Sequence, residues 1–159
     1  MKINKLFNSV NDVMSDVFDG AVIMLGGFGE AGSPIELLHG LIDKGTRDLT
    51  IIANNSGNGR VGLGALIGQR QVKKVICSFA RSAKGVTFPE LYNNGEIELE
   101  VVPQGTLAEK LRAGGSGIPA FFTKTGVGTI VSRDKETRVF NGDTFLMEQS
   151  LVPDVSLVK

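Results

Sequence analysis

Four glycines between residues 26 and 32 mark the part of the chain whose residue types best suit ligand binding. Gly26, Gly27, Gly29 and Gly32 follow directly after the apolar run 22–25. A continuous apolar run is typical of a strand that is buried on both faces. Because glycine has no side chain, the loop beyond this strand lets a ligand approach the main chain closely.

The residues after this loop predict a helix that begins beside it. Ser33 is a suitable N-cap, Pro34 suits the first helical position, and Glu36 completes a capping box. The free N–H groups and the positive dipole end of such a helix favour an anion, such as a phosphate or a carboxylate. A plain strand-to-helix turn is the alternative interpretation of the same local pattern.

The glycine spacing over 27–32 also matches the G-x-G-x-x-G pattern of dinucleotide-binding folds. Such folds place an acidic residue at the end of the next strand, about 20 residues onward. The next strand, predicted over 49–53, is followed by Asn54 and Asn55, and the nearby Asp48 precedes it. The sequence therefore disfavours a nicotinamide-dependent oxidoreductase, which would be expected to retain NAD.

Three amide side chains are predicted to lie at the same edge of the sheet as the glycine loop. Asn54, Asn55 and Gln104 each follow the carboxyl end of a predicted strand, where open α/β sheets bind ligands. Amides suit an anionic substrate whose charge changes during reaction, because they donate hydrogen bonds without adding an opposing charge. Alternatively, the asparagines form an Asx-type turn and the glutamine caps a helix.

Other reactive side chains are few. Cys77 lies in an apolar, strand-like run and is predicted to be a buried packing residue, and a single cysteine excludes an internal disulfide. His39, the only histidine, is predicted to be a surface or packing residue of a helix. Glu30 is interpreted as a solvated loop carboxylate. One histidine and one cysteine cannot make a zinc site, so no metal site is predicted.

The elements that position these residues alternate between apolar strands and helix-like segments. This alternation predicts an α/β fold with an open, mainly parallel sheet and crossover helices. The glycine-rich stretch 113–129 is predicted to be an extended loop that wraps a site, and 132–147 a small antiparallel excursion with Asn141 and Gly142 as its hairpin turn. The predicted strands are 21–25, 49–53, 74–79 and 97–102, and the predicted helices are 34–44, 60–70 and 104–113.

Length and composition predict one compact domain. The chain has 159 residues, of which 42% are hydrophobic and 21% charged, and its 17 basic residues balance 17 acidic ones. Such a balance offers no net charge to attract nucleic acid or an anionic membrane. No apolar run approaches the roughly 20 residues that cross a bilayer. Neither nucleic acid nor a membrane is therefore an expected partner, and a cytoplasmic location is expected.

Residues 19–34 resemble the first signature of the family I coenzyme A transferases, and every fixed position of that signature is met. The resemblance continues in chain order through Asn54 and Asn55 and through 103–109, 112–117 and 125–129, so it covers nearly the whole chain. Within the family, the chain is similar to the A (alpha) subunit of two-subunit transferases. The matched positions of the first signature include Asp19, Gly20, Gly26, Gly27, Phe28, Gly32 and Pro34.

The resemblance implies a CoA-transferase subunit that acts in a complex. It implies transfer of CoA from succinyl-CoA to a 3-oxoacid, with 3-oxoadipate favoured and acetoacetate or acetate/acetoacetate transfer as the alternative. The nucleophile implied is a glutamate of the B subunit, which carries CoA as a glutamyl thioester in a ping-pong reaction, so no catalytic residue is expected in this chain. The implied partners are a B (beta) subunit in an alpha2beta2 or related hetero-oligomer, acyl-CoA and small carboxylic acids. CoA thioester serves as substrate, and no permanently bound cofactor is expected.

The resemblance also implies binding residues. Asn54, Asn55 and Gln104 match positions that line the acyl pocket of the family. Arg81 is a hypothetical partner for the second carboxylate of 3-oxoadipate, because a planar guanidinium suits bidentate recognition, and a surface arginine is the competing interpretation. CoA is expected at the loop formed by Gly26, Gly27, Phe28, Gly29, Glu30, Ala31 and Gly32.

The end of the chain departs from the family pattern. Residues 155–159 form an apolar run that resembles an interior strand, whereas A subunits of the family continue beyond it. A C-terminally shortened subunit is therefore expected. The alternative from another functional class is an inactive ligand-binding or partner-regulating module, which predicts no activity even beside a genuine B subunit.

Overall fold

The chain folds into two compact units. The computed structural model describes residues 5–81 and 85–159. The first unit contains the chain up to Glu100 together with Pro153–Lys159, and the second unit is Val101–Val152. The second unit has a sheet of its own, and the single domain expected from length and composition stays a prediction.

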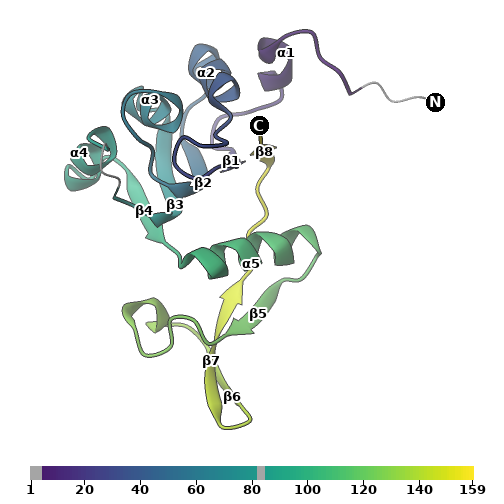
Figure 1. The fold of residues 1–159 in the computed structure, drawn as a ribbon, viewed down its shortest axis with the longest axis vertical. Coiled ribbons are helices and arrows are strands. Elements are labelled where there is room, and N and C mark those ends of the chain that lie inside the picture. The colour runs from purple at the N-terminus through teal and green to yellow at the C-terminus, as the bar shows by residue number, and fades with distance from the viewer. Residues whose placement is uncertain (1–4, 82–84) are drawn as a thin grey trace. The chain divides into compact units, whose positions relative to one another are not determined.

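The first unit is built on a five-stranded sheet (Figure 1). The strands lie in the order β4-β3-β2-β1-β8, and β1 pairs in parallel with β2 and β8, as β2 does with β3. The predicted α/β fold with a mainly parallel sheet is confirmed, and the four predicted strands end within two residues of the observed ends. The strands are β1 (Val22–Leu25), β2 (Leu49–Asn55), β3 (Val72–Phe79), β4 (Glu98–Val101) and β8 (Val155–Leu157).

Helices of the first unit lie side by side against this sheet (Figure 1). Because β1 to β4 cross the sheet in chain order, right-handed connections place the helices between them on one face. The core between helices and sheet includes Ile23, Leu38, Leu41, Leu66 and Val75, all completely buried. The helices are α1 (Val10–Met14), α2 (Ile35–Lys44), α3 (Gly62–Gly68) and α4 (Thr87–Asn93), of which the sequence predicts only α2 and α3.

Helix α2 begins without the capping box that the sequence predicts. Pro34 is its N-cap residue, and no side-chain hydrogen bond caps the helix. The Ile35 N–H donates instead to the Ser33 carbonyl oxygen, at 3.0 Å. This tight turn replaces the extended N-cap geometry that a serine side chain needs in order to reach the first-turn N–H groups, so the predicted cap is wrong.

The second unit combines one α-helix, α5 (Gln104–Gly115), and a short 3-10 helix, η1 (Ile130–Ser132), with a three-stranded antiparallel sheet of order β5-β7-β6. Its strands are β5 (Ala120–Thr123), β6 (Thr137–Phe140) and β7 (Asp143–Gln149). Asn141 and Gly142 have φ values of +51° and +83°, which confirms the predicted hairpin turn. The predicted loop over 113–129 is wrong in part, because α5 extends to Gly115 and β5 pairs with β7. Among the residues described, none of the helices is both long and apolar enough to cross a bilayer.

Lys44, the last residue of α2, forms hydrogen bonds with the carboxyl end of α1. Its replacement by methionine is expected to destabilise the first unit. The Lys44 ammonium donates to the carbonyl oxygens of Met14 and Ser15, both at 2.7 Å, and to that of Val17. Methionine keeps the length of the side chain but leaves carbonyls at the end of α1 without these donors, at a cost of about 1–2 kcal/mol. Urea unfolding measures the loss, with the exposed Lys73→Met as control, and equal stability of the two variants would contradict this role.

Candidate functional site

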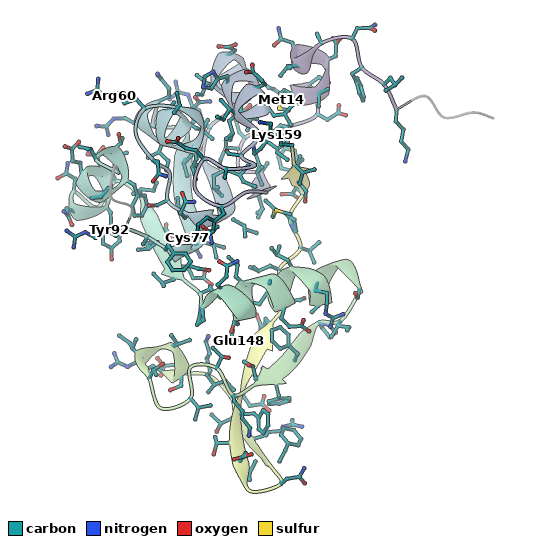
Figure 2. The ribbon with its side chains drawn as sticks, viewed as in Figure 1. Met14, Arg60, Cys77, Tyr92, Glu148 and Lys159 are labelled. Carbon is teal, nitrogen blue, oxygen red and sulfur yellow. The ribbon has the colours of Figure 1, made fainter. Side chains whose placement is uncertain are left out.

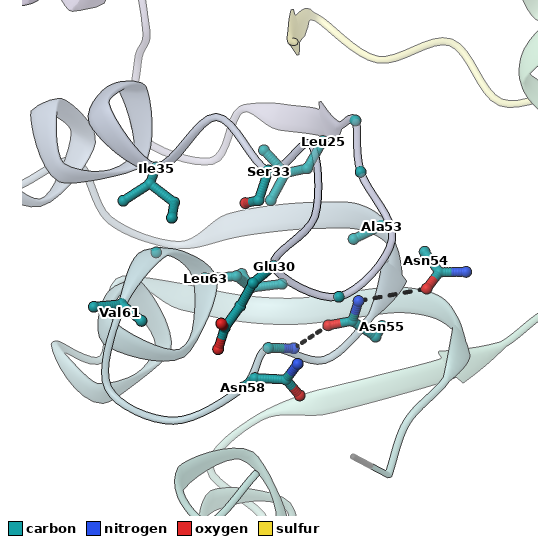
Figure 3. A pocket seen from close by; sticks show the side chains of 15 residues that line it. Leu25, Glu30, Ser33, Ile35, Ala53, Asn54, Asn55, Asn58, Val61 and Leu63 are labelled. Atoms are coloured by element: carbon teal, nitrogen blue, oxygen red, sulfur yellow. Dashed lines mark hydrogen bonds between the residues drawn. The ribbon is translucent and has the colours of Figure 1, made fainter. Parts of the chain in front are cut away.

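A pocket opens at the carboxyl ends of β1 and β2, where the glycine loop meets the turn that follows β2 (Figure 3). Met24 is paired with Ile52 in the sheet, so the residues after Leu25 lie beside the end of β2. The structure thus brings the glycine loop together with Asn54 and Asn55. The pocket is lined by Leu25, Gly26, Gly27, Gly29, Glu30, Ser33, Ile35, Ala53, Asn54, Asn55, Gly57, Asn58, Val61, Gly62 and Leu63.

The glycine loop is folded tightly on itself. The N–H of Phe28 donates to the Ala31 carbonyl oxygen at 2.9 Å, and the N–H of Ala31 donates back to Phe28 at 3.2 Å. Gly27 has φ +115°, and a Cβ atom there would lie 2.9 Å from the Ser33 nitrogen. Only glycine fits this position, because both the dihedral angle and the space exclude a side chain.

Not all residues of the loop face the pocket. Gly26, Gly27, Gly29 and Glu30 line it, whereas Phe28, Ala31 and Gly32 do not. The side chain of Phe28 is 73% exposed. The predicted CoA-binding loop is therefore divided by the structure into a pocket-facing part and an outer part.

Asn55 holds the turn that follows β2. Its side-chain oxygen accepts a hydrogen bond from the Gly57 N–H at 2.8 Å, and its amide nitrogen donates to the Asn54 side-chain oxygen at 3.4 Å (Figure 3). The first of these bonds is the Asx turn that the sequence offers as the alternative to substrate binding. The amide nitrogen of Asn55 carries a second hydrogen, so the turn leaves a donor for a ligand.

Asn58 also lines the pocket and is not among the site residues predicted from the sequence. Its side-chain oxygen is buried and has no hydrogen-bond partner among the described residues. A buried acceptor without a donor costs about 1–3 kcal/mol, so this oxygen suits a ligand N–H or O–H group. The third asparagine of the Asn-Asn-x-Gly-Asn-Gly stretch 54–59 is the sequence signal that could have identified it.

Glu30, from the glycine loop, and Asn58, from the turn after β2, both line the pocket (Figure 3). Glu30 is exposed and is the only carboxylate among the lining residues. Within the described part of the chain, no lysine or arginine forms an ion pair with it. These features fit the predicted solvated loop carboxylate.

Arg81 is not among the residues that line this pocket, and Gln104 belongs to the other unit. Arg81 follows β3 and lines a separate hollow with Ala80, Phe88, Tyr92 and Leu99. Gln104 is exposed and is the first residue of α5, in the second unit. The structure therefore assembles the two asparagines and the glycine loop, and it does not place Arg81 among the residues that line their pocket.

The other reactive groups are unsuited to nucleophilic or metal chemistry. Cys77 is completely buried, as predicted (Figure 2). Burial raises the pKa of the Cys77 thiol to about 11, although a hydrogen bond from the Phe79 backbone opposes the rise, so the thiol stays protonated at neutral pH. His39 is exposed, and its Nε2 accepts a hydrogen bond from the Gly62 N–H at 3.4 Å. Within the described ranges, no cluster of three or more His, Cys, Asp or Glu side chains could hold a metal ion.

Comparisons with known proteins give concordant results. Residues 7–159 match the family described as Coenzyme A transferase. The chain is 52% identical over 157 residues to the A subunit of 3-oxoadipate CoA-transferase from Pseudomonas putida, covering 99% of this chain and 68% of the relative. It is 42% identical to the A subunit of the probable succinyl-CoA:3-ketoacid coenzyme A transferase from Bacillus subtilis. That match covers 99% of this chain and 65% of the relative. The chain thus spans about two thirds of the length of these relatives.

Solved structures share the fold at lower sequence identity. An acyl-CoA transferase of Escherichia coli O157:H7, in a thioester complex with CoA, superimposes with a TM-score of 0.82 at 21% identity, covering 94% of this chain and 33% of that chain. Glutaconate coenzyme A-transferase of Acidaminococcus fermentans superimposes with a TM-score of 0.81 at 18% identity, covering 94% of this chain and 55% of that chain. At these identities the likeness establishes the fold alone.

Proposed function

The chain belongs to the coenzyme A transferase family, and from this membership we propose that it is the A subunit of a two-subunit enzyme. The proposed reaction moves CoA from succinyl-CoA to a 3-oxoacid, with 3-oxoadipate preferred over acetoacetate. The observation that carries the proposal is the pocket in which the glycine loop meets Asn54 and Asn55. The identity of these residues, in this order and in a chain of this family, supports a site for a thioester and a carboxylate.

The pocket supplies neutral hydrogen-bond donors where the charge of the substrate changes. A thioester carbonyl is neutral, a tetrahedral intermediate carries an oxyanion, and the released acid is a carboxylate. The amide nitrogens of Asn54 and Asn55 can donate hydrogen bonds to the substrate oxygen in each of these states. They form no ion pair, which would stabilise one charge state of the substrate over the others. The main chain at Gly27 and Gly29 allows the substrate to approach without meeting side chains.

The nucleophile of the proposed reaction is a glutamate of the B subunit. Its carboxylate attacks the thioester carbonyl and CoA leaves as a thiolate, which then attacks the resulting anhydride at the glutamyl carbonyl and releases succinate. The glutamyl-CoA thioester passes CoA to the second acid by the reverse steps, which gives ping-pong kinetics. Among the described residues, Glu30 is the only carboxylate that lines the pocket, and it forms no ion pair with a lysine or arginine.

Reconstitution tests the proposed function. CoA transfer from succinyl-CoA to 3-oxoadipate and to acetoacetate is measured with only this chain, with only a B subunit, and with both together. Activity only in the mixture, with a higher kcat/KM for 3-oxoadipate, is expected. A stable complex without activity would favour a partner-regulating module instead, and light scattering of the same mixture would test the proposed alpha2beta2 assembly.

Arg81 is proposed to select the dicarboxylic acceptor. The Ser56 hydroxyl donates to the Ala80 carbonyl oxygen at 2.7 Å. This hydrogen bond joins the turn after β2 to the residue that precedes Arg81. Arg81→Ala is expected to lower kcat/KM for 3-oxoadipate roughly 10- to 100-fold, because a charge-assisted bond to its second carboxylate is lost. Activity with acetoacetate, which lacks that carboxylate, is expected to change less than about twofold.

The control for Arg81 is the exposed Arg133→Ala, which removes an arginine from the second unit. It is expected to leave the ratio of the two activities unchanged. Equal losses on both acceptors in Arg81→Ala would contradict recognition of the second carboxylate and would favour the surface interpretation.

A further inference from the structure

The hollow beside Arg81 has the size of a ligand site. Its cavity volume is about 670 Å³, within the range of small-molecule sites. The described residues that line it all belong to the first unit, so the hollow lies within one unit of the chain. The side chains used in the argument below are those of Ala80, Arg81, Phe88, Tyr92, Asn93 and Leu99.

The wall of the hollow on α4 is aromatic. Phe88 and Tyr92 are four residues apart on this helix and therefore lie on the same face of it. Their rings stack with centroids 6.0 Å apart and planes inclined by 14°. Phe88 is buried in the core, whereas Tyr92 is 48% exposed (Figure 2). Together with the half-buried Leu99 of β4, this wall suits the methylene groups of a ligand, because contact with it removes apolar surface from water.

Arg81 adds one positive charge to this apolar hollow. Its side chain is exposed, and within the described ranges no aspartate or glutamate forms an ion pair with it. The described lining residues include no carboxylate that could compete for the guanidinium. A carboxylate can bind the planar guanidinium through two parallel hydrogen bonds. The hollow therefore suits an anion that carries its charge at the end of an apolar chain.

The hollow adjoins the pocket of the glycine loop along the edge of one sheet. Asn55, which lines the pocket, is the sheet partner of Phe79, and Ser56 is hydrogen-bonded to Ala80 in the wall of the hollow. Neighbouring strands lie about 4.8 Å apart. A carbon chain that has its first carboxyl group at Asn55 is therefore led towards Arg81.

We propose that the hollow binds the distal part of the acyl group, with the terminal carboxylate on Arg81 and the methylene groups against Tyr92 and Leu99. Cavities of this volume hold drug-sized ligands, so a six-carbon acid fills only part of it. The hollow accordingly admits dicarboxylic 3-oxoacids longer than 3-oxoadipate. The inference rests on the proposed function and adds longer dicarboxylic acids to its substrates.

Tyr92 gives a direct test of binding. It is the only tyrosine of a chain without tryptophan, so tyrosine emission of the isolated chain reports on this hollow. Glutarate, adipate and suberate are used as probes because they lack the labile 3-oxo group. Each is expected to change the emission, with a dissociation constant that falls roughly 2- to 4-fold for each added methylene. No response to suberate, or a dissociation constant that rises with chain length, would overturn the inference.

Asn93→Phe tests whether the chain of the acid occupies the hollow itself. Asn93 is the exposed last residue of α4, and a phenyl ring there fills part of the hollow. It is expected to weaken suberate binding roughly 5- to 20-fold, because several methylenes lose their contacts, and glutarate binding less than about twofold. Asn94→Phe adds the same ring one residue later, at an exposed position that does not line the hollow, and is the matched control. Equal effects of the two variants on suberate would contradict this site.

Activity in the complex tests the substrate class. With a B subunit, kcat/KM for 3-oxosuberate is expected to equal or exceed that for 3-oxoadipate, and Asn93→Phe is expected to lower it roughly 5- to 20-fold relative to Asn94→Phe. A complex that is active on 3-oxoadipate but rejects 3-oxosuberate would overturn the inference. A complex inactive on both acids would instead refute the proposed function, and the titration of the isolated chain would still decide whether the hollow binds dicarboxylic acids.

Discussion

Replacing Gly114 with alanine is expected to destabilise the second unit by roughly 2–4 kcal/mol. A Cβ atom at this position of α5 would lie 2.1 Å from the Leu151 carbonyl oxygen and 3.0 Å from the Val152 side chain. Real Cβ atoms do not approach a backbone oxygen so closely, so either α5 or the segment that follows β7 must move. Leu151 cannot retreat freely, because its N–H is bonded to the Lys110 carbonyl oxygen on the same helix.

Gly115→Ala is the matched control, since it adds the same methyl group one residue later in the same helix. No atom lies within 4 Å of a Cβ at Gly115, and the substitution is expected to be neutral or to stabilise by up to about 1 kcal/mol through helix propensity. Thermal unfolding followed by circular dichroism should show a melting temperature about 5–15 °C lower for Gly114→Ala. Equal melting temperatures of the two variants would contradict the crowding at Leu151.

The first unit could be predicted well because its signals are local. Apolar runs end at glycines or amides, and parallel strands with crossover helices follow from their alternation. Helix α1 was missed because it depends on distant partners: Lys44 binds its last carbonyls, and Val10 packs against the gap left by Gly40. Such contacts have no signature in a segment of five residues.

The second unit is less predictable because its glycines, which locally indicate a loop, lie in part within a helix. Gly114 and Gly115 instead end α5, where Gly114 makes room for the chain leaving β7. Phe121 and Phe122 belong to β5, which exists only through pairing with β7, more than twenty residues later in the chain. Pairing over that separation cannot be read from local composition, whereas the hairpin at Asn141 and Gly142 could be.

The site, too, could be predicted only where local sequence determines the position of a residue. The rule that parallel strands end at one edge placed Asn54 and Asn55 beside the glycine loop. It could not separate Arg81 from them, because the rule identifies an edge and not a pocket. It also missed Asn58, whose place in the wall depends on how the turn after β2 packs against α3.

That packing makes Gly64→Ala the substitution with the largest expected effect on the site. A Cβ atom at Gly64 would lie 2.6 Å from the Gly59 carbonyl oxygen and 2.9 Å from that of Asn58. The methyl group must push the turn 57–59 away from α3, and the turn carries the Asn58 side chain and the Asx bond of Asn55. Stability is expected to fall by about 1–3 kcal/mol.

The loss of activity in Gly64→Ala is expected to exceed what the loss of stability explains. At a temperature where the variant is fully folded, and in the presence of a B subunit, kcat/KM for succinyl-CoA should fall roughly 100-fold, because the pocket donors are displaced. Gly68→Ala adds a methyl group at the other end of α3, only 3.7 Å from the Thr87 side chain, an ordinary contact, and should keep near-parental activity. If Gly64→Ala kept full activity while folding normally, the turn after β2 would have no part in binding the thioester, and the proposed site would have to be sought elsewhere along the carboxyl edge of the sheet.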